Sequence, residues 1–151
     1  MGMFTALNIS ASALSVERQR SEIVAANLAN VDTTHTEKGI GPYRRKEVVV
    51  ESSGQTPFAQ ILRAGGNGPI GLGQPGGVRL ARVVDDPSEP IRRYEPGHPD
   101  ADSQGYLSYP AINPAQEMVD LMGSVRSYQL NASAVQASKQ IIEQSIDLLK
   151  S

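Results

Sequence analysis

The chain has 151 residues, and its 14 lysines and arginines against 16 aspartates and glutamates give a net charge of −2 at pH 7. A charge so close to zero gives no reason to expect binding to nucleic acid or to an anionic membrane surface. Cysteine is absent, which excludes disulfides and thiolate metal sites, and aromatic residues make up only 5% of the chain, which argues against a large conventional core. The length suits one ordinary domain, or a helical part with a small second part.

Residues 4–28 predict a first helix with a thin apolar face. Its apolar positions recur in steps of three and four, the spacing of a coiled-coil seam: Phe4, Leu7, Ala11, Leu14, Ala25 and Leu28. Arg18 and Ser21 interrupt this seam, and the frequent alanines and serines would let another helix approach closely. Two interpretations stay open: an amphipathic helix in a two-helix hairpin, or a coiled coil whose remaining apolar faces meet other subunits.

Residues 32–112 predict a β-rich insert, because helical periodicity stops and glycine and proline become frequent. Strands are expected at residues 43–51, 78–84 and 105–110, where β-branched or alternating apolar residues occur. Residues 58–62 fit either a strand or a short helical turn. The glycine-rich stretch 65–77 contains two prolines and predicts a mobile surface loop of unassigned role.

Residues 113–149 predict the longest helix. Asn113 is a good N-cap, Pro114 suits the first helical position, and Gln116 could complete a capping box. Only Lys139 interrupts its seam, which is Met118, Leu121, Val125, Tyr128, Ala132, Val135, Ile142, Ile146 and Leu149. Such a helix would be roughly 55 Å long at 1.5 Å per residue, and so narrow a stripe rarely stabilises a helix alone.

These elements predict a mainly α fold with a β-rich insert, in which the N- and C-terminal helices form a coiled-coil-like core. We expect an N-terminal core helix in residues 1–31, the insert in residues 32–112 with its glycine-rich loop at 65–77, and a C-terminal core helix in residues 113–151. The first residues lack the basic region and apolar run of a secretory signal. No run of about 18 apolar residues predicts a membrane span.

Patterns that could support chemistry are weak in this chain. Residues 66–71 match the dinucleotide pattern G-x-G-x-x-G, but Pro69 removes a backbone N–H and no helix start follows, so a flexible loop is favoured. His98, Asp100 and Asp102 alternate and could present metal ligands, although the neighbouring glycine and prolines favour a turn with solvated carboxylates. We therefore predict no enzyme activity, no cofactor and no metal site.

Three segments resemble one known protein family. Residues 26–33, Ala-Asn-Leu-Ala-Asn-Val-Asp-Thr, resemble the signature of the bacterial flagellar axial proteins that form the rod, the hook and hook-associated structures. Residues 117–122 and 126–131 resemble the C-terminal helix of the same superfamily. Residues 96–110 are similar to a segment of its proximal-rod members. Mild departures from that segment's pattern occur at three places: Glu95, Leu107 and the pair Ala111-Ile112.

The resemblance implies a structural subunit of the flagellar proximal rod, with its terminal helices in an inner α-helical core and its β-rich part outside. Such a subunit would assemble helically, transmit motor torque, and have copies of itself and other rod proteins as partners. It would be exported without a cleaved signal by the flagellar type III apparatus, to the basal body where the rod crosses the periplasm. The terminal regions of family members order on assembly.

The residues expected at the assembly interface combine both helical seams with the signature asparagines. They are Leu7, Ala11, Leu14, Ala25, Asn27, Leu28, Asn30, Met118, Leu121, Val125, Tyr128, Val135, Ile142, Ile146 and Leu149. Two alternatives stay open. One is a generic coiled-coil adaptor that binds a single partner helix, and the other is a different axial subunit of the rod or hook. No nucleic-acid partner is expected in any of these cases.

Overall fold

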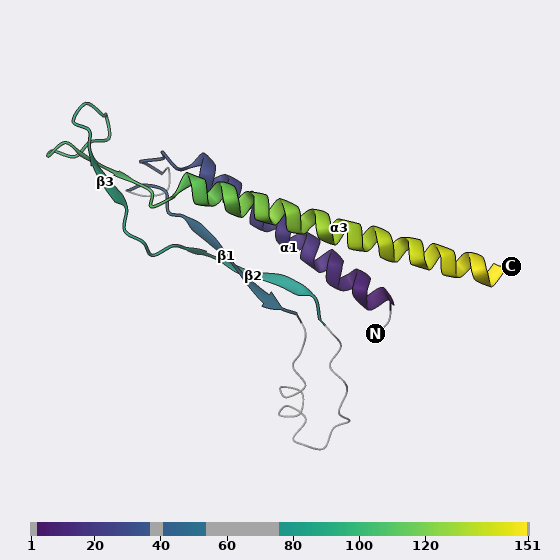
Figure 1. Ribbon diagram of the computed structural model, residues 1–151. Helices are drawn as coiled ribbons and strands as arrows, with labels where there is room; N and C mark the ends of the chain where they lie inside the picture. Colours follow the sequence, from purple (N-terminus) through teal and green to yellow (C-terminus); the bar gives the residue numbers. More distant parts are fainter. Residues whose placement is uncertain (1–2, 37–40, 54–75, 151) are drawn as a thin grey trace, which may run out of the picture. The chain divides into compact units, whose positions relative to one another are not determined.

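The computed structural model describes residues 3–36, 41–53 and 76–150 (Figure 1). In chain order the elements are α1 (Met3–Ala29), β1 (Lys46–Ser52), β2 (Val78–Asp85), β3 (Ile91–Tyr94), β4 (Tyr106–Tyr109) and α3 (Pro114–Lys150). The predicted mainly α fold, with a small antiparallel-strand region between two terminal helices, is confirmed. The dinucleotide-like pattern at 66–71, the segment 58–62 and most of the loop at 65–77 lie outside the described residues, as do the side chains of Phe4 and Leu149.

Both helices begin and end close to the predicted residues. The end of α1 and the start of α3 are capped by local hydrogen bonds, but one predicted contact, that of Gln116, is not formed. The backbone N–H of Asn30 donates to the carbonyls of Ala26 and Asn27, at 3.1 and 3.2 Å, and closes the last turn of α1. At the start of α3, Asn113 Oδ1 accepts the N–H of Ala115 at 3.0 Å, which confirms the N-cap. The expected capping box is wrong, because Gln116 Nε2 donates to Asp120 Oδ1 at 3.2 Å, one turn further on.

The insert contains two two-stranded sheets, β1 with β2 and β3 with β4. Hydrogen bonds from Ser53 N–H to the Gly77 carbonyl (2.8 Å) and from Asp86 N–H to the Arg45 carbonyl (2.7 Å) show that β1 and β2 run antiparallel. Strand β3 was not predicted from the sequence. Its four residues are all exposed, so it lacks the alternation of buried and exposed side chains that marks a half-buried strand.

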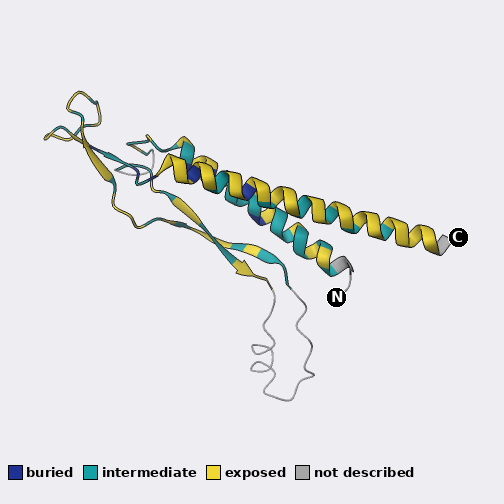
Figure 2. Cartoon of the chain, viewed as in Figure 1, coloured by how far each residue is buried: buried dark blue, intermediate teal, exposed yellow. Residues whose placement is uncertain are grey.

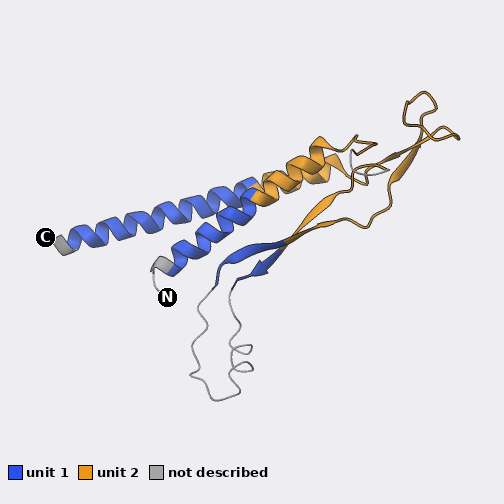
Figure 3. Ribbon diagram, turned by 180° about the vertical axis from the view of Figure 1, so that it is seen from behind, with its two compact units in different colours: residues 1–18, 50–81, 125–151 blue, residues 19–49, 82–124 orange. Residues whose placement is uncertain are grey.

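The chain divides into two compact units, coloured separately in Figure 3: residues 1–18, 50–81 and 125–151 form unit 1, and residues 19–49 and 82–124 form unit 2. Each unit contains part of both helices and part of the β1–β2 pair. Little of either unit is buried (Figure 2). Among the described residues, unit 1 buries Val16, whereas unit 2 buries the apolar Val24, Leu107 and Ile112 and the polar Asn27, Glu117 and Ser124. The buried part of unit 2 therefore contains both polar contacts and apolar packing.

In unit 2, the hairpin of β3 and β4 is closed by a loop that Asp102 organises. The strands pair in the register Ile91↔Tyr109 to Tyr94↔Tyr106. The Asp102 carboxylate accepts the N–H groups of Tyr106 and Gln104, at 2.8 and 2.9 Å, and a guanidinium hydrogen bond from Arg92 at 2.9 Å. The backbone hydrogen bond from Tyr106 is the largest cause that lowers the pKa of Asp102 below its usual value. Asp102 is thus a turn-forming residue, in agreement with the turn interpretation of residues 98–102.

We expect the substitution Gly105→Ala to destabilise this hairpin by about 1–3 kcal/mol, the cost of forcing a side chain into a strained backbone conformation. Gly105 has a φ of +80°, and an added Cβ would lie 2.9 Å from Tyr94 Cε2 and 3.1 Å from Pro96 Cβ. Gly97→Ala is the matched control in the same loop, because an added Cβ there meets nothing within 4 Å. Chemical denaturation checks the difference, and equal stability of the two variants would show that the loop adapts.

Candidate assembly interface

The most buried polar side chain of unit 2 is Asn27, near the end of α1. It has no exposed surface, and all four of its hydrogen-bonding positions are used. Its Nδ2 donates to the Lys46 carbonyl at 2.9 Å and to Glu117 Oε2 at 3.1 Å. Its Oδ1 accepts the N–H of Lys46 at 2.9 Å and the hydroxyl of Tyr43 at 3.1 Å. One side chain therefore joins α1, the start of β1 and the first turn of α3.

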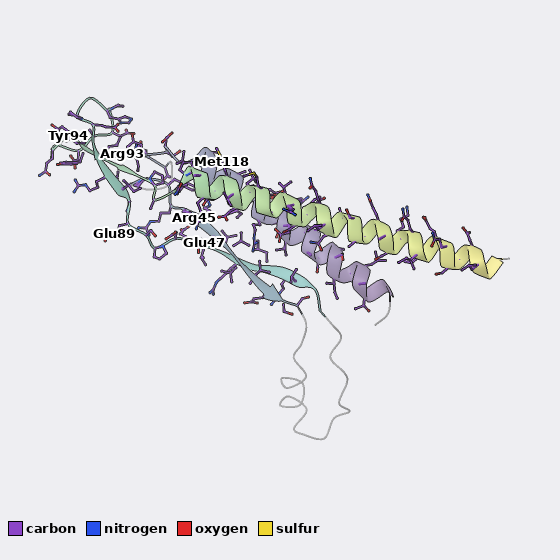
Figure 4. The ribbon with its side chains drawn as sticks, in the orientation of Figure 1. Arg45, Glu47, Glu89, Arg93, Tyr94 and Met118 are labelled. Atoms are coloured by element: carbon purple, nitrogen blue, oxygen red, sulfur yellow. The ribbon has the colours of Figure 1, made fainter. Side chains whose placement is uncertain are left out.

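Glu117 completes this arrangement from the first turn of α3. It is only 1% exposed, and its second carboxylate oxygen, Oε1, accepts from Arg45 Nε at 2.6 Å. Arg45 also pairs with the exposed Glu47, and its guanidinium lies 3.8 Å from carboxylate oxygens of both Asp86 and Asp120. Figure 4 shows Arg45 and Glu47 at the start of β1 and Met118 on the first turns of α3. We call Asn27, Tyr43, Arg45, Lys46 and Glu117 the polar cluster.

The electrostatics of the polar cluster are consistent with a stably charged Arg45. Burial alone lowers the pKa of Arg45, but the hydrogen bonds and negative charges of Glu117 and, to a smaller extent, Glu47 together more than offset this effect, so the pKa is raised above its usual value. Burial also raises the pKa of the Tyr43 hydroxyl, with smaller contributions from Asp85 and Glu117. The ion pair between Arg45 and Glu117 is charge-assisted and thus stronger than a neutral hydrogen bond.

The residues that follow Asn27 form a tightly bonded turn rather than an open loop. Asn30 Nδ2 donates to the Ala26 carbonyl at 2.8 Å, and Asn30 Oδ1 accepts the hydroxyl of Thr33 at 3.1 Å. The hydroxyl of Thr34 then donates to Asp100 Oδ2 at 2.7 Å, in the loop between β3 and β4. Residues 26–34 therefore connect the end of α1 to the start of β1 and to the loop between β3 and β4, which gives the asparagine-rich signature a structural role.

The outer surface of α3 is unusually apolar for a helix in contact with water. Exposed large apolar side chains occur in two stretches, one near the start of the helix and one near its end: Met118, Val119, Met122, Val125, Tyr128 and Leu130, and then Ile141, Ile146 and Leu148. Exposed apolar patches on such a scale mark surfaces that bind another protein. This surface, rather than a pocket with reactive groups, is the candidate functional site.

The predicted interface residues differ in their exposure to solvent: some are exposed, some are half-buried and one is fully buried. The exposed ones are Ala11, Ala25, Met118, Val125, Tyr128 and Ile146, and the half-buried ones are Leu7, Leu14, Leu28, Leu121, Val135 and Ile142. Asn27 is fully buried and the half-buried Asn30 bonds within its own turn, so neither presents its side chain as a free contact surface. The pattern of the sequence did not reveal the partners of Asn27, because Tyr43, Arg45 and Glu117 are distant in the chain and only folding brings them together.

Among the described residues, no group of three or more histidine, aspartate and glutamate side chains is placed to hold a metal ion. Likewise, neither α1 nor α3, over the residues described, is apolar enough along its length to cross a membrane. His98 Nδ1 accepts the N–H of Asp100 at 3.1 Å, which uses this histidine within the turn.

Two family models of flagellar rod proteins match this chain, one near its N-terminus and one near its C-terminus. The family model described as "Flagella basal body rod protein" matches residues 7–34, and the model described as "Flagellar basal body rod FlgEFG protein C-terminal" matches residues 103–148. The first match contains the signature turn, and the second contains β4, Glu117 and most of α3.

Curated relatives match over nearly their whole length, and each bears the name flagellar basal-body rod protein FlgC. The protein of Bacillus subtilis (strain 168) is 39% identical, with 99% of this chain and 100% of the relative covered. Those of Borreliella burgdorferi and Escherichia coli O157:H7 are 32% and 33% identical, with 99% and 98% of both chains covered. The chain therefore belongs to the FlgC family of flagellar basal-body rod proteins.

Proposed function

We propose that the chain is a structural subunit of the flagellar basal-body rod that joins its neighbours through the exposed faces of α1 and α3. The observation that carries this proposal is the contrast along α3. Glu117 and Ser124 are buried against the rest of the chain, whereas large apolar side chains remain exposed from Met118 to Leu148. Membership of the FlgC family favours a rod subunit over a generic coiled-coil adaptor.

The polar cluster makes the subunit rigid, and a subunit that transmits torque needs rigidity as well as contacts between helices. Buried hydrogen bonds and ion pairs depend strongly on geometry, so they fix one arrangement of the elements that they join. In unit 2 they fix the end of α1, the start of β1 and the first turn of α3. A rod made of such subunits would resist shear between the helical part and the insert, and would in this way transmit torque.

The proposal extends to position, partners and export. Neighbours would be copies of this chain and other rod proteins, and the subunit would lie in the proximal part of the rod, where it crosses the periplasm. Contacts between unlike surfaces of successive copies do not close on themselves, so they would extend as a helical tube. We propose export by the flagellar type III apparatus without a cleaved signal. N-terminal sequencing of the subunit from purified basal bodies tests this point, because an N-terminus at Met1 or Gly2 is expected.

The substitution Val125→Asp is expected to prevent rod assembly and to abolish swimming. Val125 is 45% exposed, so the subunit should fold, while an interface that covers this position would have to bury a charge without a partner. Leu121→Asp would act in the same direction, but Leu121 is half-buried and the change would also disturb folding. Swimming in soft agar and electron microscopy of basal bodies measure the effect.

The control is Gln144→Asp, which adds the same charge at an exposed polar position two residues before Ile146, about 200° around α3 from that seam residue. Cells with this variant should swim. Circular dichroism of both purified variants establishes that their helix content equals that of the original chain. Normal rods in Val125→Asp cells would refute assembly through this part of α3.

A further inference from the structure

Strand β3 has one edge that no other segment of the described chain covers. In an antiparallel pair, residues whose backbone groups bond to the neighbouring strand alternate with residues whose groups point away from it. The Glu95 N–H donates to the Gly105 carbonyl at 2.9 Å, in the register of β3 and β4. Arg93 therefore also bonds to β4, whereas the N–H and carbonyl groups of Arg92 and Tyr94 point outward. Within the described chain β3 pairs only with β4, so these four groups have no hydrogen-bond partner there.

The opposite edge of the same hairpin is closed by its own loop. Tyr106 of β4 lies opposite Tyr94, and its backbone groups likewise point out of the hairpin. Its N–H donates to Asp102 Oδ1 at 2.8 Å, and its carbonyl accepts the N–H of Asp102 at 2.9 Å. This edge of β4 is thus protected against pairing with another chain, and the edge of β3 is not.

The charged side chains of β3 lie over β4 and leave the free edge of β3 open. The Arg92 guanidinium lies 4.9 Å from the centre of the Tyr106 ring and 2.9 Å from the Asp102 carboxylate. The Arg93 guanidinium lies 4.8 Å from the centre of the Tyr109 ring. Charged side chains protect many natural edge strands, but here both arginines contact residues on the other side of their strand.

The free edge is short and has defined ends. The next residues in the same alternation are Pro90 on one side and Pro96 on the other. Proline has no backbone N–H, so neither residue can donate to a further strand. The edge therefore offers one donor and one acceptor from each of Arg92 and Tyr94, which suits one short extended segment.

Arg93 determines the charge that such a segment should have. Arg92 is paired with Asp102, whereas Arg93 is exposed and forms no ion pair within the described part of the chain. An antiparallel strand bonded to Arg92 and Tyr94 would place one residue directly opposite Arg93, with the Cα atoms about 4.5 Å apart. A carboxylate at that position stabilises the pair, and a cation destabilises it.

Strand β3 of a second copy does not meet this requirement. If two β3 strands paired antiparallel through their outward groups, Arg92 of each copy would bond to Tyr94 of the other. The two Arg93 side chains would then lie directly opposite each other, and like charges in this position destabilise a sheet. The charges therefore favour a different partner.

We propose that the free edge of β3 binds an extended acidic segment of a different protein, which adds a third strand to the hairpin and places a carboxylate opposite Arg93. β-Branched residues on either side of this carboxylate would lie beside Arg92 and Tyr94, and Tyr94 is 64% exposed and offers apolar surface to them. Every group involved belongs to the hairpin, so this binding is independent of the proposed assembly through α1 and α3.

Amide hydrogen exchange of the full chain, measured by NMR, tests which backbone groups are used. The probe is the capped peptide Thr-Val-Glu-Val-Thr. The N–H groups of Arg92 and Tyr94 should exchange quickly in the free chain and slowly with excess peptide, while that of Glu95, which already donates to Gly105, stays slow. Unchanged exchange at excess peptide would overturn the proposal. Protection in the free chain that rises with protein concentration would also overturn it, because a second copy would then occupy the edge.

An exchange of charges tests the role of Arg93. The peptide Thr-Val-Glu-Val-Thr should bind about twofold to thirtyfold more tightly than Thr-Val-Lys-Val-Thr, the effect of exchanging an attractive for a repulsive pair across neighbouring strands. In the variant Arg93→Glu the preference should reverse. Equal binding of the two peptides to the original chain, or a preference that Arg93→Glu leaves unchanged, would refute recognition by charge at this position.

A proline substitution tests the edge itself. Arg92→Pro removes an outward N–H without removing a bond to β4, and edge strands accept proline at such positions. It should abolish the protection of Tyr94 by the acidic peptide. Arg92→Ala is the matched control, because it removes the same side chain and keeps the N–H, and it should still bind. Slow exchange at Glu95 establishes that the hairpin is intact in both variants. Equal binding by both would overturn the proposal and would leave assembly through the helices, which Val125→Asp tests, unaffected.

Discussion

Replacement of Glu117 by glutamine should lower the free energy of unfolding by about 2–3 kcal/mol, although the two side chains have nearly the same shape. Both carboxylate oxygens of Glu117 accept hydrogen bonds, from Arg45 Nε and from Asn27 Nδ2. A glutamine would have to turn its NH2 group toward one of these donors. One buried donor would lose its partner, and Arg45 would lose its most buried counter-charge. Only a carboxylate satisfies both neighbours.

The exposed pair of Glu143 and Lys139, 3.6 Å apart on α3, provides the control. Because this pair is exposed, Glu143→Gln should change stability by no more than about 0.5 kcal/mol. Urea unfolding followed by circular dichroism compares the two variants. Amide exchange at Lys46 gives a local measure, since its N–H donates to Asn27 in the polar cluster. Unchanged exchange at Lys46 in Glu117→Gln would show that the carboxylate does not hold the cluster together.

The sequence predicts the two helices well because each carries its signals locally. Asn113 caps α3 as its position before Pro114 suggests, and the turn at Asn30 ends α1. Heptad spacing marks both seams, and β-branched residues mark β1 and β2. These features depend on residues within a few positions of one another. The hydrogen-bond and side-chain preferences of short segments are therefore sufficient to predict them.

The polar cluster could not be predicted in the same way, because its members are distant in the sequence. Asn27 and Glu117 are 90 residues apart, and Arg45 and Glu117 are 72 apart. Arg45 belongs to a short basic run and Glu117 to the first turn of a helix, where a surface position is the ordinary expectation. The family resemblance pointed to Asn27, but only the folded chain shows that this residue bonds inward.

Strand β3 also escaped sequence analysis, for a physical reason. Strand β3 is stabilised by side-chain stacking across its pair instead of by burial: the Tyr94 and Tyr106 rings lie 5.3 Å apart edge to face, and the Arg92 guanidinium lies 4.9 Å from the Tyr106 ring.

The substitution Asn27→Asp should be more damaging than Glu117→Gln, at about 3–5 kcal/mol near neutral pH, the cost of an uncompensated buried charge. The side chains differ only in that an oxygen replaces Nδ2. In the folded chain Nδ2 donates to the Lys46 carbonyl and to Glu117 Oε2. A carboxylate would instead place an acceptor against two acceptors, one of which is itself a buried carboxylate.

This loss should depend on pH in a defined direction. A new carboxyl at position 27, buried beside Glu117, would have its pKa raised well above the usual value near 3.9. A raised pKa means that the folded state binds more protons than the unfolded state, so stability falls as pH rises. The variant should be most stable relative to the original chain below about pH 4, and should weaken as the pH passes through the raised value.

Unfolding of Asn27→Asp and of the original chain over a series of pH values measures this difference directly. Asn8→Asp is the matched control, because Asn8 is exposed on the same helix, and its difference from the original chain should stay small and nearly independent of pH. A deficit in Asn27→Asp that does not change with pH would mean that the new group stays ionised throughout or is neutralised by Arg45. Either result would contradict the arrangement in which Arg45 is paired with Glu117, and in which Asn27 Nδ2 donates to the Lys46 carbonyl and to Glu117.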